Sequence, residues 1–362
     1  MKLKSLTTTA VALPNPLPYA TTPDWRIEAI NAVVVELATD DGVVGISYAF
    51  ALNKRHLKPL HAFIESMWEL LDGQDPVPID RLWQRMNRDA RSVSMRGLGQ
   101  IAITALDVAL WDLQGKLFGQ PVYKLLGGNR DRIATYASYD LWPSAKPDDL
   151  AKRGAAFVKE GFRAMKPRAS MTGDAAYEAQ RLKALREAVG PKVELMLDVA
   201  TQWNASQAIR IGRVLEPYRL FWLEDPVGPE DYDGLTQVAA ALDTPIAAGE
   251  LHYTKHAFRQ LIDQRCVDIV MIDLQRVGGF TEWRKVAAYA EAHSLPVVSH
   301  LAPELSVHPM CGIANGLTVE YLPWGFPLFK EVPPVVDGKL VPFQKPGLGL
   351  ELDLKNIKKY KL

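Results

Sequence analysis

Short apolar runs alternate with amphipathic stretches over the last two thirds of the chain. In the stretches between the runs, apolar residues recur at helical spacing, as at Leu235, Val238, Ala239 and Leu242. Parallel strands joined by helices have this alternation, and eight of them predict an α/β fold closed as a TIM-type (β/α) barrel. The eight apolar runs cover residues 133–138, 162–168, 194–200, 219–225, 244–250, 267–273, 295–300 and 317–322.

The first third of the chain has a different pattern. Two β-rich runs, 30–39 and 43–50, are joined by Asp40-Asp41-Gly42, which is a strong hairpin signal. Helical patterns follow, and the last of them, 101–119, is apolar on several faces and is expected to be buried. We therefore expect three parts: an N-terminal α+β capping domain over 1–128, the barrel over 129–327, and a segment over 328–362, rich in Pro and Gly, that returns to the capping domain.

Composition and charge exclude several classes of function. The chain carries 42 basic and 42 acidic residues and no long block of one sign, so nucleic acid and anionic membranes are not expected partners. Pro14, Pro16 and Pro18 interrupt the N-terminal apolar stretch, which argues against a signal peptide. Cys266 and Cys311 are expected to be reduced thiols in a cytoplasmic protein.

Three carboxylates end successive apolar runs. Asp198, Glu224 and Glu250 are spaced 26 residues apart, which is the length of one βα unit, so all three should emerge at the same end of the barrel. One such carboxylate taken alone is more often a helix cap or an ion-pair partner. Three of them close together would repel one another without a cation. Oxygen ligands without cysteine favour a hard cation, and we expect Mg²⁺.

Polar residues also end other predicted strands. Asp273 and His300 end the sixth and seventh, so the carboxylate can fix one imidazole nitrogen and leave the other as a base that works near neutral pH. A lone histidine is more often a packed residue, but its place opposite a metal site favours the base. Lys166 and Arg168 lie on the second strand and Glu320 on the eighth.

Taken together, these motifs resemble the enolase superfamily, and within it the mandelate racemase group. The resemblance covers nearly the whole chain and includes ALDVALWDLQGKLFGQPVYKLLGG at 105–128 as well as the strand-end residues. It implies removal of the proton α to a carboxylate, giving an enediolate held by Mg²⁺. By the same resemblance, Lys166 neutralises the substrate carboxylate, and Glu320, as a protonated acid, donates a hydrogen bond to the enediolate. From the residues alone, the less favoured alternative is that Lys166 and Glu320 form a structural ion pair.

Two positions depart from the family pattern. The second strand carries Lys166-Pro167-Arg168, whereas racemases of the family have Lys-x-Lys with the second lysine as a base. Arginine holds its proton too firmly for that role, so we expect Arg168 to bind a carboxylate or hydroxyl of the substrate. The second departure is Ala200, where relatives often carry Asn.

With one base, His300, elimination is favoured over racemisation. The leading hypothesis is a Mg²⁺-dependent lyase that dehydrates an aldonic or aldaric acid sugar to a 2-keto-3-deoxy acid. The alternatives are a racemase, epimerase or cycloisomerase that uses the same enediolate, and a catalytically silent metal-binding scaffold. We expect the loops at 13–25 and 50–55, with polar residues Asn15, Tyr19, Asp24, Asn53, Lys54 and Arg55, to close over the barrel mouth and select the substrate. The resemblance also implies a homo-oligomer.

Overall fold

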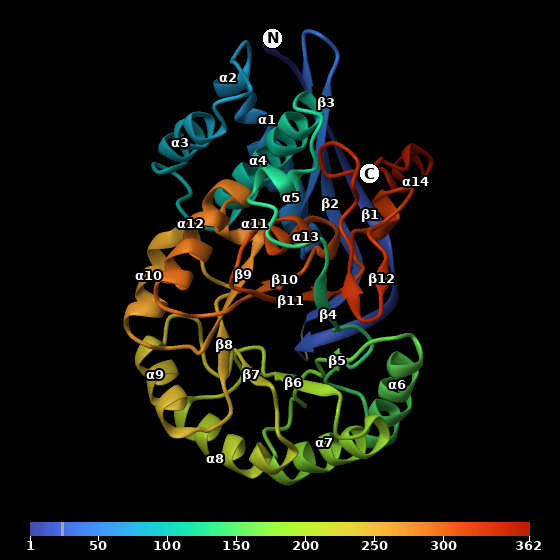
Figure 1. Ribbon diagram of the computed structural model, residues 1–362, viewed down its shortest axis with the longest axis vertical. Coiled ribbons are helices and arrows are strands. Elements are labelled where there is room, and N and C mark those ends of the chain that lie inside the picture. Colours follow the sequence, from blue (N-terminus) through green and yellow to red (C-terminus); the bar gives the residue numbers. More distant parts are fainter. Residues whose placement is uncertain (23–24) are drawn as a thin grey trace.

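A computed structural model describes the backbone of residues 1–22 and 25–362 and the side chains of residues 1–15 and 27–362. The N-terminal part is a three-stranded antiparallel sheet in the order β1-β2-β3, with helices packed on it (Figure 1). The strands are β1 (Leu3–Thr22), β2 (Trp25–Thr39) and β3 (Val44–Ala51). The helices are α1 (Lys54–Ser66), α2 (Trp68–Leu71), α3 (Ile79–Ala90), α4 (Leu98–Leu117) and α5 (Val122–Leu125).

The predicted hairpin between β2 and β3 is present. Gly42 has a φ of 88°, a left-handed conformation that a side chain would disfavour, and its N–H donates to the carbonyl of Thr39 at 3.1 Å. Strand β1 was not predicted, because Pro14, Pro16 and Pro18 lack the N–H donors that a strand needs. It pairs with β2 alone, and its register shifts after Pro14, so the prolines lie on an edge strand where they are tolerated.

Eight parallel strands follow and close into a barrel through the pairing of β11 with β4. Each lies within one of the eight apolar runs or extends one residue beyond it, so the predicted barrel is confirmed. The strands are β4 (Ile133–Ala137), β5 (Ala164–Met165), β6 (Glu194–Asp198), β7 (Trp222–Glu224), β8 (Ile246–Ala248), β9 (Ile269–Asp273), β10 (Val297–His300) and β11 (Gly316–Tyr321).

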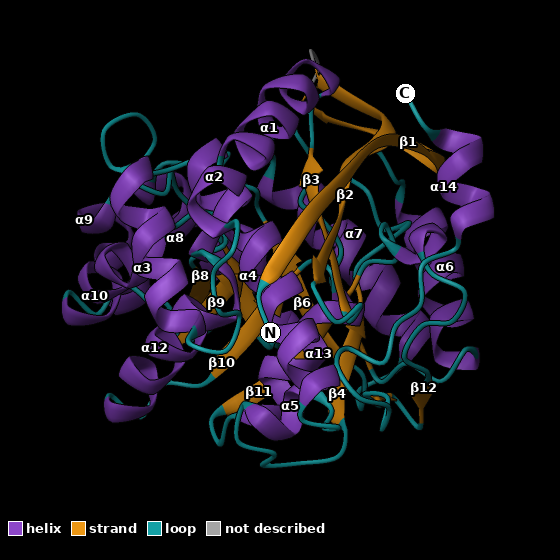
Figure 2. Cartoon of the chain, turned by 90° about the horizontal axis from the view of Figure 1, so that it is seen from above, coloured by secondary structure: helices purple, strands orange, loops and turns teal. Residues whose placement is uncertain are grey.

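Helices surround the barrel strands (Figure 2). They bury their apolar faces, as predicted for α9, where Leu235 and Val238 are buried. The helices are α6 (Pro147–Lys159), α7 (Ala175–Val189), α8 (Ala205–Leu215), α9 (Tyr232–Ala241), α10 (Thr254–Asp263), α11 (Leu274–Val277), α12 (Gly279–Ala292) and α13 (Pro303–Gly312), with short 3₁₀ helices at Glu216–Tyr218 and Phe326–Leu328. Within the described ranges, no helix combines the length and apolar character needed to cross a bilayer.

The C-terminal segment contacts both other parts. Strand β13 (Lys339–Leu340) pairs with β12 (Val335–Val336) and, antiparallel, with the barrel strand β4. After α14 (Leu354–Tyr360), the N–H of Leu362 donates to the carbonyl of Ala10 on β1 at 3.0 Å. Figure 1 shows this segment running beside the long strands of the N-terminal sheet. The exact boundaries of the three parts stay a prediction.

Helix α4 joins the N-terminal part to the barrel. Fifteen of its residues are buried, as expected for a helix that is apolar on several faces, and it packs against β3 on one side and α11 and α12 on the other. Asp107 of α4 accepts a hydrogen bond from the N–H of Thr281 at 3.0 Å, and Thr104 donates one to the carbonyl of Gln275 at 2.8 Å. The N-terminal part is thereby held against the barrel end from which α11 and α12 begin.

Candidate active site

The residues predicted to carry chemistry meet at the carboxyl ends of the barrel strands. Asp198 and Glu224 end β6 and β7 and are register partners, and so are Asp273 and His300 at the ends of β9 and β10. Glu250 follows β8 by two residues. Lys166 and Arg168 follow β5, and Glu320 lies on β11. All eight lie at the end of the barrel where TIM-type enzymes carry their active sites.

Lys166 lies fully buried among carboxylates. Its Nζ contacts Glu224, lies 3.1 Å from an oxygen of Glu320 and is 3.9 Å from Asp198. Burial lowers the pKa of Lys166, but Glu224 and Glu320 outweigh burial and raise that pKa well above its usual range. Lys166 is therefore a fixed cation. The ion pair with Glu320, one of the two roles open from the sequence, is present in this arrangement.

The three candidate metal ligands present only oxygen atoms. In the part of the chain that the structure describes, no three His, Cys, Asp or Glu side chains form a ready ligand set. We attribute this to the nitrogen atoms already beside them, since Lys166 Nζ contacts Glu224 and His300 Nε2 lies 3.1 Å from Glu250 Oε2. The donors still fit a hard cation, because Glu250 Oε2 is buried without a properly oriented hydrogen bond and Asp198 and Glu224 are buried carboxylates on adjacent strands.

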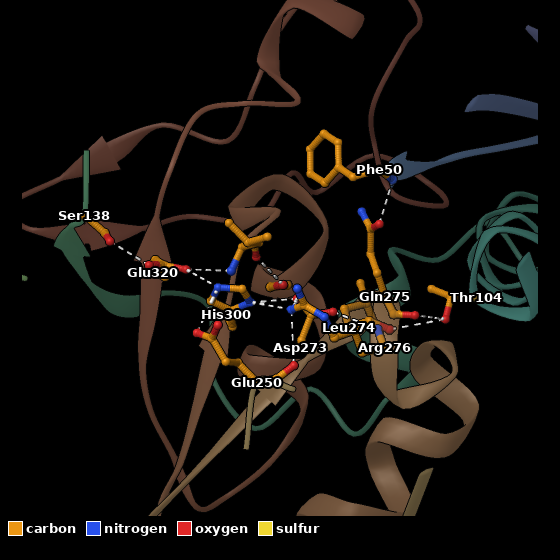
Figure 3. A network of polar contacts seen from close by, with 12 residues as sticks. Phe50, Thr104, Ser138, Glu250, Asp273, Leu274, Gln275, Arg276, His300 and Glu320 are labelled. Atoms are coloured by element: carbon orange, nitrogen blue, oxygen red, sulfur yellow. Dashed lines mark hydrogen bonds and ion pairs between the residues drawn. The ribbon is translucent and has the colours of Figure 1, made fainter. Parts of the chain in front are cut away.

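His300 and Asp273 form the predicted dyad. His300 Nδ1 lies 2.7 Å from Asp273 Oδ2, so the carboxylate can hold the proton on Nδ1 and leave Nε2 facing the site (Figure 3). Burial lowers the pKa of His300, but Glu250, Glu320 and Asp273 together raise it above its usual range. The dyad has the geometry of a general base that becomes a general acid once it has taken a proton.

Glu320 differs from the expected protonated acid. Ser138 Oγ donates to one of its oxygens at 2.6 Å and the N–H of Leu301 to the other at 2.7 Å. Burial raises the pKa of Glu320, but Lys166, His300 and these two hydrogen bonds outweigh burial and lower the pKa below its usual range. In this arrangement Glu320 is a carboxylate. The sequence could not show this, because the shift depends on how close Lys166 lies.

Arg168 lies beside a candidate metal ligand. Its Nε is 3.3 Å from Asp198 Oδ2, and its guanidinium lies 5.6 Å from the ring centre of Trp142. The carbonyl of Arg168 accepts a hydrogen bond from Arg181 Nη1 at 3.0 Å, and Arg181 is itself buried in an ion pair with Glu178. Asp198 and Trp142 therefore position the guanidinium, and Arg181 fixes the backbone that carries it.

Ala200 stands two residues after Asp198 with a φ of 50°. This left-handed conformation is one that Asn adopts more readily than Ala, which gives a backbone reason for the Asn expected in relatives. The N–H of Ala200 donates to Asp198 Oδ1 at 2.8 Å. The backbone thus supports the carboxylate whichever side chain is present.

Comparison with known proteins agrees with this geometry. Residues 5–127 match the model for the mandelate racemase/muconate lactonizing enzyme N-terminal domain, and residues 149–356 match the model for the enolase C-terminal domain-like family. The chain belongs to the mandelate racemase/muconate lactonizing enzyme family. The predicted membership is confirmed.

Relatives within the mandelate racemase/muconate lactonizing enzyme family have known activities. The chain is 32% identical to the L-talarate/galactarate dehydratase of Salmonella typhimurium over 89% of this chain and 81% of that one. It is 31% identical to the 3,6-anhydro-alpha-L-galactonate cycloisomerase of Streptomyces coelicolor over 90% of each chain. Among solved structures, the L-talarate dehydratase of Polaromonas sp. JS666, complexed with Mg and L-glucarate, aligns with a TM-score of 0.92 and 31% identity over 100% of this chain and 97% of that one.

Arg276 is a site residue of this family member that sequence reasoning missed. Its Nη1 lies 3.0 Å from Asp273 Oδ2, 3.2 Å from the carbonyl of Glu250 and 3.4 Å from His300 Nδ1. Burial raises the pKa of Asp273, but Arg276 and His300 outweigh burial and keep that pKa below its usual range. The three-residue spacing from Asp273 at the start of a helix was the available signal.

Trp222 and Ser138 were missed as well. Trp222 Nε1 donates to Glu224 Oε2 at 2.9 Å, and Ser138 donates to Glu320. Trp222 lies on β7 and Ser138 directly follows β4, so in the sequence they resemble an ordinary core residue and an ordinary strand-end residue. Nothing in the sequence distinguishes them from packing residues.

The structure describes some of the residues in the two loops that were predicted to close over the barrel mouth. Asn53 and Arg55, but not Lys54, line a cavity of about 430 Å³ that also includes Asp273 and Arg276, so the loop after β3 reaches the site. Asn15 lines a smaller cavity of about 220 Å³ with Trp142. The side chains of Tyr19 and Asp24 lie outside the described residues.

Proposed function

We propose that this protein is a Mg²⁺-dependent dehydratase that converts an aldonic or aldaric acid sugar to a 2-keto-3-deoxy acid. The observation that carries the proposal is the placement of one imidazole base, His300, with Arg168 where racemases of the family carry a second lysine base. An enzyme with a base on one face only is suited to elimination. The dehydratases among its relatives, one of them crystallised with Mg and L-glucarate, support the same choice.

The site residues have separate proposed roles in binding the cation and the substrate. Asp198, Glu224 and Glu250 would hold the cation, which supplies charge stabilisation for the developing enediolate. Lys166, held as a cation by Glu224 and Glu320, places a positive charge where the substrate carboxylate is expected to bind. Arg168 presents a planar fork of donors for a carboxylate or hydroxyl oxygen.

His300 carries the proton. Its Nε2 takes the proton from the carbon next to the carboxylate, while Asp273 stabilises the imidazolium through Nδ1. The imidazolium then returns that proton to the leaving hydroxyl on the adjacent carbon, which departs as water. The resulting enol becomes the 2-keto acid by taking a proton from solvent at the carbon that lost the hydroxyl.

One rival function has a specific observation in its favour. The similarity to a cycloisomerase supports an isomerisation through the same enediolate. A catalytically silent scaffold is disfavoured, because every predicted strand-end residue remains in place.

The test is an assay for 2-keto acids. The protein is incubated with Mg²⁺ and a panel of aldonic and aldaric acids, and His300→Asn serves as the matched inactive control. We expect keto acid from at least one acid with the parent protein and none with the variant. Exchange of the α-proton on some acid without formation of any keto acid would contradict dehydration.

A further inference from the structure

The cavity beside the dyad is lined by polar side chains as well as apolar ones. It measures about 430 Å³, within the range of small-molecule sites, and lies between the end of β3 and helix α11. Because Asp273 and Arg276 also line it, a substrate whose reacting carbon faces His300 can extend its far end into this space. The groups that meet that far end decide which acid fits.

Gln275 presents a fixed donor to this cavity. The N–H of Phe50 can only donate, and it lies 2.7 Å from Gln275 Oε1, so the amide oxygen must face Phe50 (Figure 3). The carbonyl of Gln275 accepts the hydroxyl of Thr104, which fixes the other end of the residue. Gln275 Nε2 is left without a hydrogen-bond partner, although the residue is only 6% exposed. A buried donor of this kind calls for an acceptor on the ligand.

The remaining polar lining is also rich in donors. Asn53 Oδ1 is already used, because it accepts from the N–H of Arg55 at 3.0 Å and from Arg55 Nε at 3.3 Å. The charge of Arg276 is balanced by Asp273, with which it forms an ion pair. Arg55 has no carboxylate partner among the described residues, so its guanidinium supplies a net positive charge at the cavity mouth.

We propose that this cavity receives the distal carboxylate of an aldaric acid, with Gln275 Nε2 and Arg55 as its donors. The inference rests on the proposed function and narrows its substrate from acid sugars in general to diacids. An aromatic acid would suit the apolar wall formed by Leu98 and Ile101. A ring, however, would leave Gln275 Nε2 buried without a partner, which opposes binding. The terminal hydroxymethyl group of an aldonic acid supplies an acceptor but no charge for Arg55.

The experiment compares matched acids. With Mg²⁺ present, kcat/KM is measured for galactarate against galactonate and for glucarate against gluconate, with mandelate as the aromatic probe. Dissociation constants for the same acids are measured by calorimetry, so that the preference is tested even where no turnover occurs. We expect at least one diacid to exceed its monoacid partner by about tenfold or more, the effect of one charge-assisted hydrogen bond.

Variants of Arg55 and Gln275 test whether these two residues cause the preference for diacids. Arg55→Gln and Gln275→Glu should each reduce the diacid-to-monoacid ratio about tenfold, because the first removes the charge and the second replaces the donor with an acceptor. Gln275→Glu keeps an oxygen for Phe50 and so preserves the local fold. Lys58→Gln is the control, since it removes one exposed charge from the same helix without lining the cavity. If the Gln275 variant does not fold, the inference is tested by the diacid-to-monoacid ratio of the Arg55→Gln variant, because Arg55 is exposed.

The outcomes separate the two proposals. A ratio near one, a preference for monoacids or mandelate, or variants that leave the ratio unchanged would overturn the diacid inference while leaving dehydration intact. Diacid-selective binding without any keto acid would support the diacid inference and contradict the proposed function. Failure of every acid to bind would overturn both.

Discussion

His300 is enclosed by three carboxylates, and each of them restricts what its ring can do. Asp273 fixes Nδ1 at 2.7 Å, while Glu250 and Glu320 lie 3.1 Å and 3.9 Å from Nε2. An imidazole in such surroundings is easily protonated, and a cation bound to Glu250 would offset part of that negative charge. The ring can therefore act as a base only when the carboxylates around it are neutralised by their own partners.

The variant His300→Asn should abolish proton abstraction. Asparagine retains a polar group for Asp273 but has no titratable nitrogen, so we expect at least about a thousandfold loss of α-proton exchange, at the upper part of the range for general-base catalysis. Exchange is followed by NMR in D₂O, and calorimetry with Mg²⁺ verifies that the metal site is intact. Persistent exchange in the variant would mean that Lys166 or Arg168 acts as a base.

The variant Arg168→Lys tests the missing second base. Lysine can lose its proton when it is desolvated, whereas arginine cannot, so the variant should exchange the α-proton of the opposite epimer, which the parent protein leaves untouched. Dehydration should fall about tenfold, because the forked contact is lost. The readout is deuterium incorporation into each epimer. If the parent protein exchanged the α-proton of both epimers, it would have a base on each face of the substrate. Elimination could then not be attributed to a single base.

At the scale of elements, the carboxyl ends of the barrel strands carry the site, and helices α11 and α13 connect the N-terminal sheet to it. Helix α11 carries Gln275 and Arg276, one hydrogen-bonded to Phe50 of β3 and the other to Asp273. Helix α13 carries Glu304, whose carboxylate accepts a hydrogen bond from Tyr48 of β3. Both contacts place the start of the loop at 50–55 against the dyad.

Glu304 makes the second contact sensitive to pH. Burial raises the pKa of Glu304 to about 7, partly offset by the hydrogen bond from Tyr48. An unfolded glutamate titrates near pH 4.3, so between about pH 4.3 and 7 the unfolded chain releases a proton that the folded chain keeps. The free energy of unfolding therefore falls as pH rises through this window, by at most about 4 kcal/mol.

The variant Glu304→Gln removes that titration and keeps an acceptor for Tyr48. The difference in melting temperature between variant and parent should shift in favour of the variant from pH 5 to pH 8. Thermal unfolding followed by circular dichroism at both pH values measures this difference. A difference that does not depend on pH would contradict a buried, proton-holding Glu304.

The elements themselves could be predicted to different extents. The eight barrel strands and the β2–β3 hairpin follow from periodicity and turn residues. Strand β1 does not, because Pro14 is tolerated there only through its edge position. The strand-end acids could be found because their spacing repeats with the βα unit. Gln275 could not, since its role depends on Phe50 of β3 lying against α11, and for Arg276 the only signal was its three-residue spacing from Asp273.

At the scale of the whole molecule, the proposed function and the diacid inference divide catalysis and selection between the two parts. The barrel supplies His300, Lys166 and the three acids, while the N-terminal part supplies Arg55 and, through Phe50, orients Gln275. Fully buried contacts of α4 with α11 and α12 hold the parts together. We therefore expect that substitutions in the loop after β3 can alter which substrate is bound, while the acids and bases of the barrel stay the same.

Proton NMR in D₂O tests the central claim most directly. The parent protein, Mg²⁺ and the acid sugar that turns over fastest are mixed, and substrate and product are followed together. We predict loss of water to give a 2-keto-3-deoxy acid, with solvent deuterium at the carbon that lost the hydroxyl and none in an inverted substrate. Deuterium in an inverted substrate, with no water lost, would contradict the account and assign an isomerase.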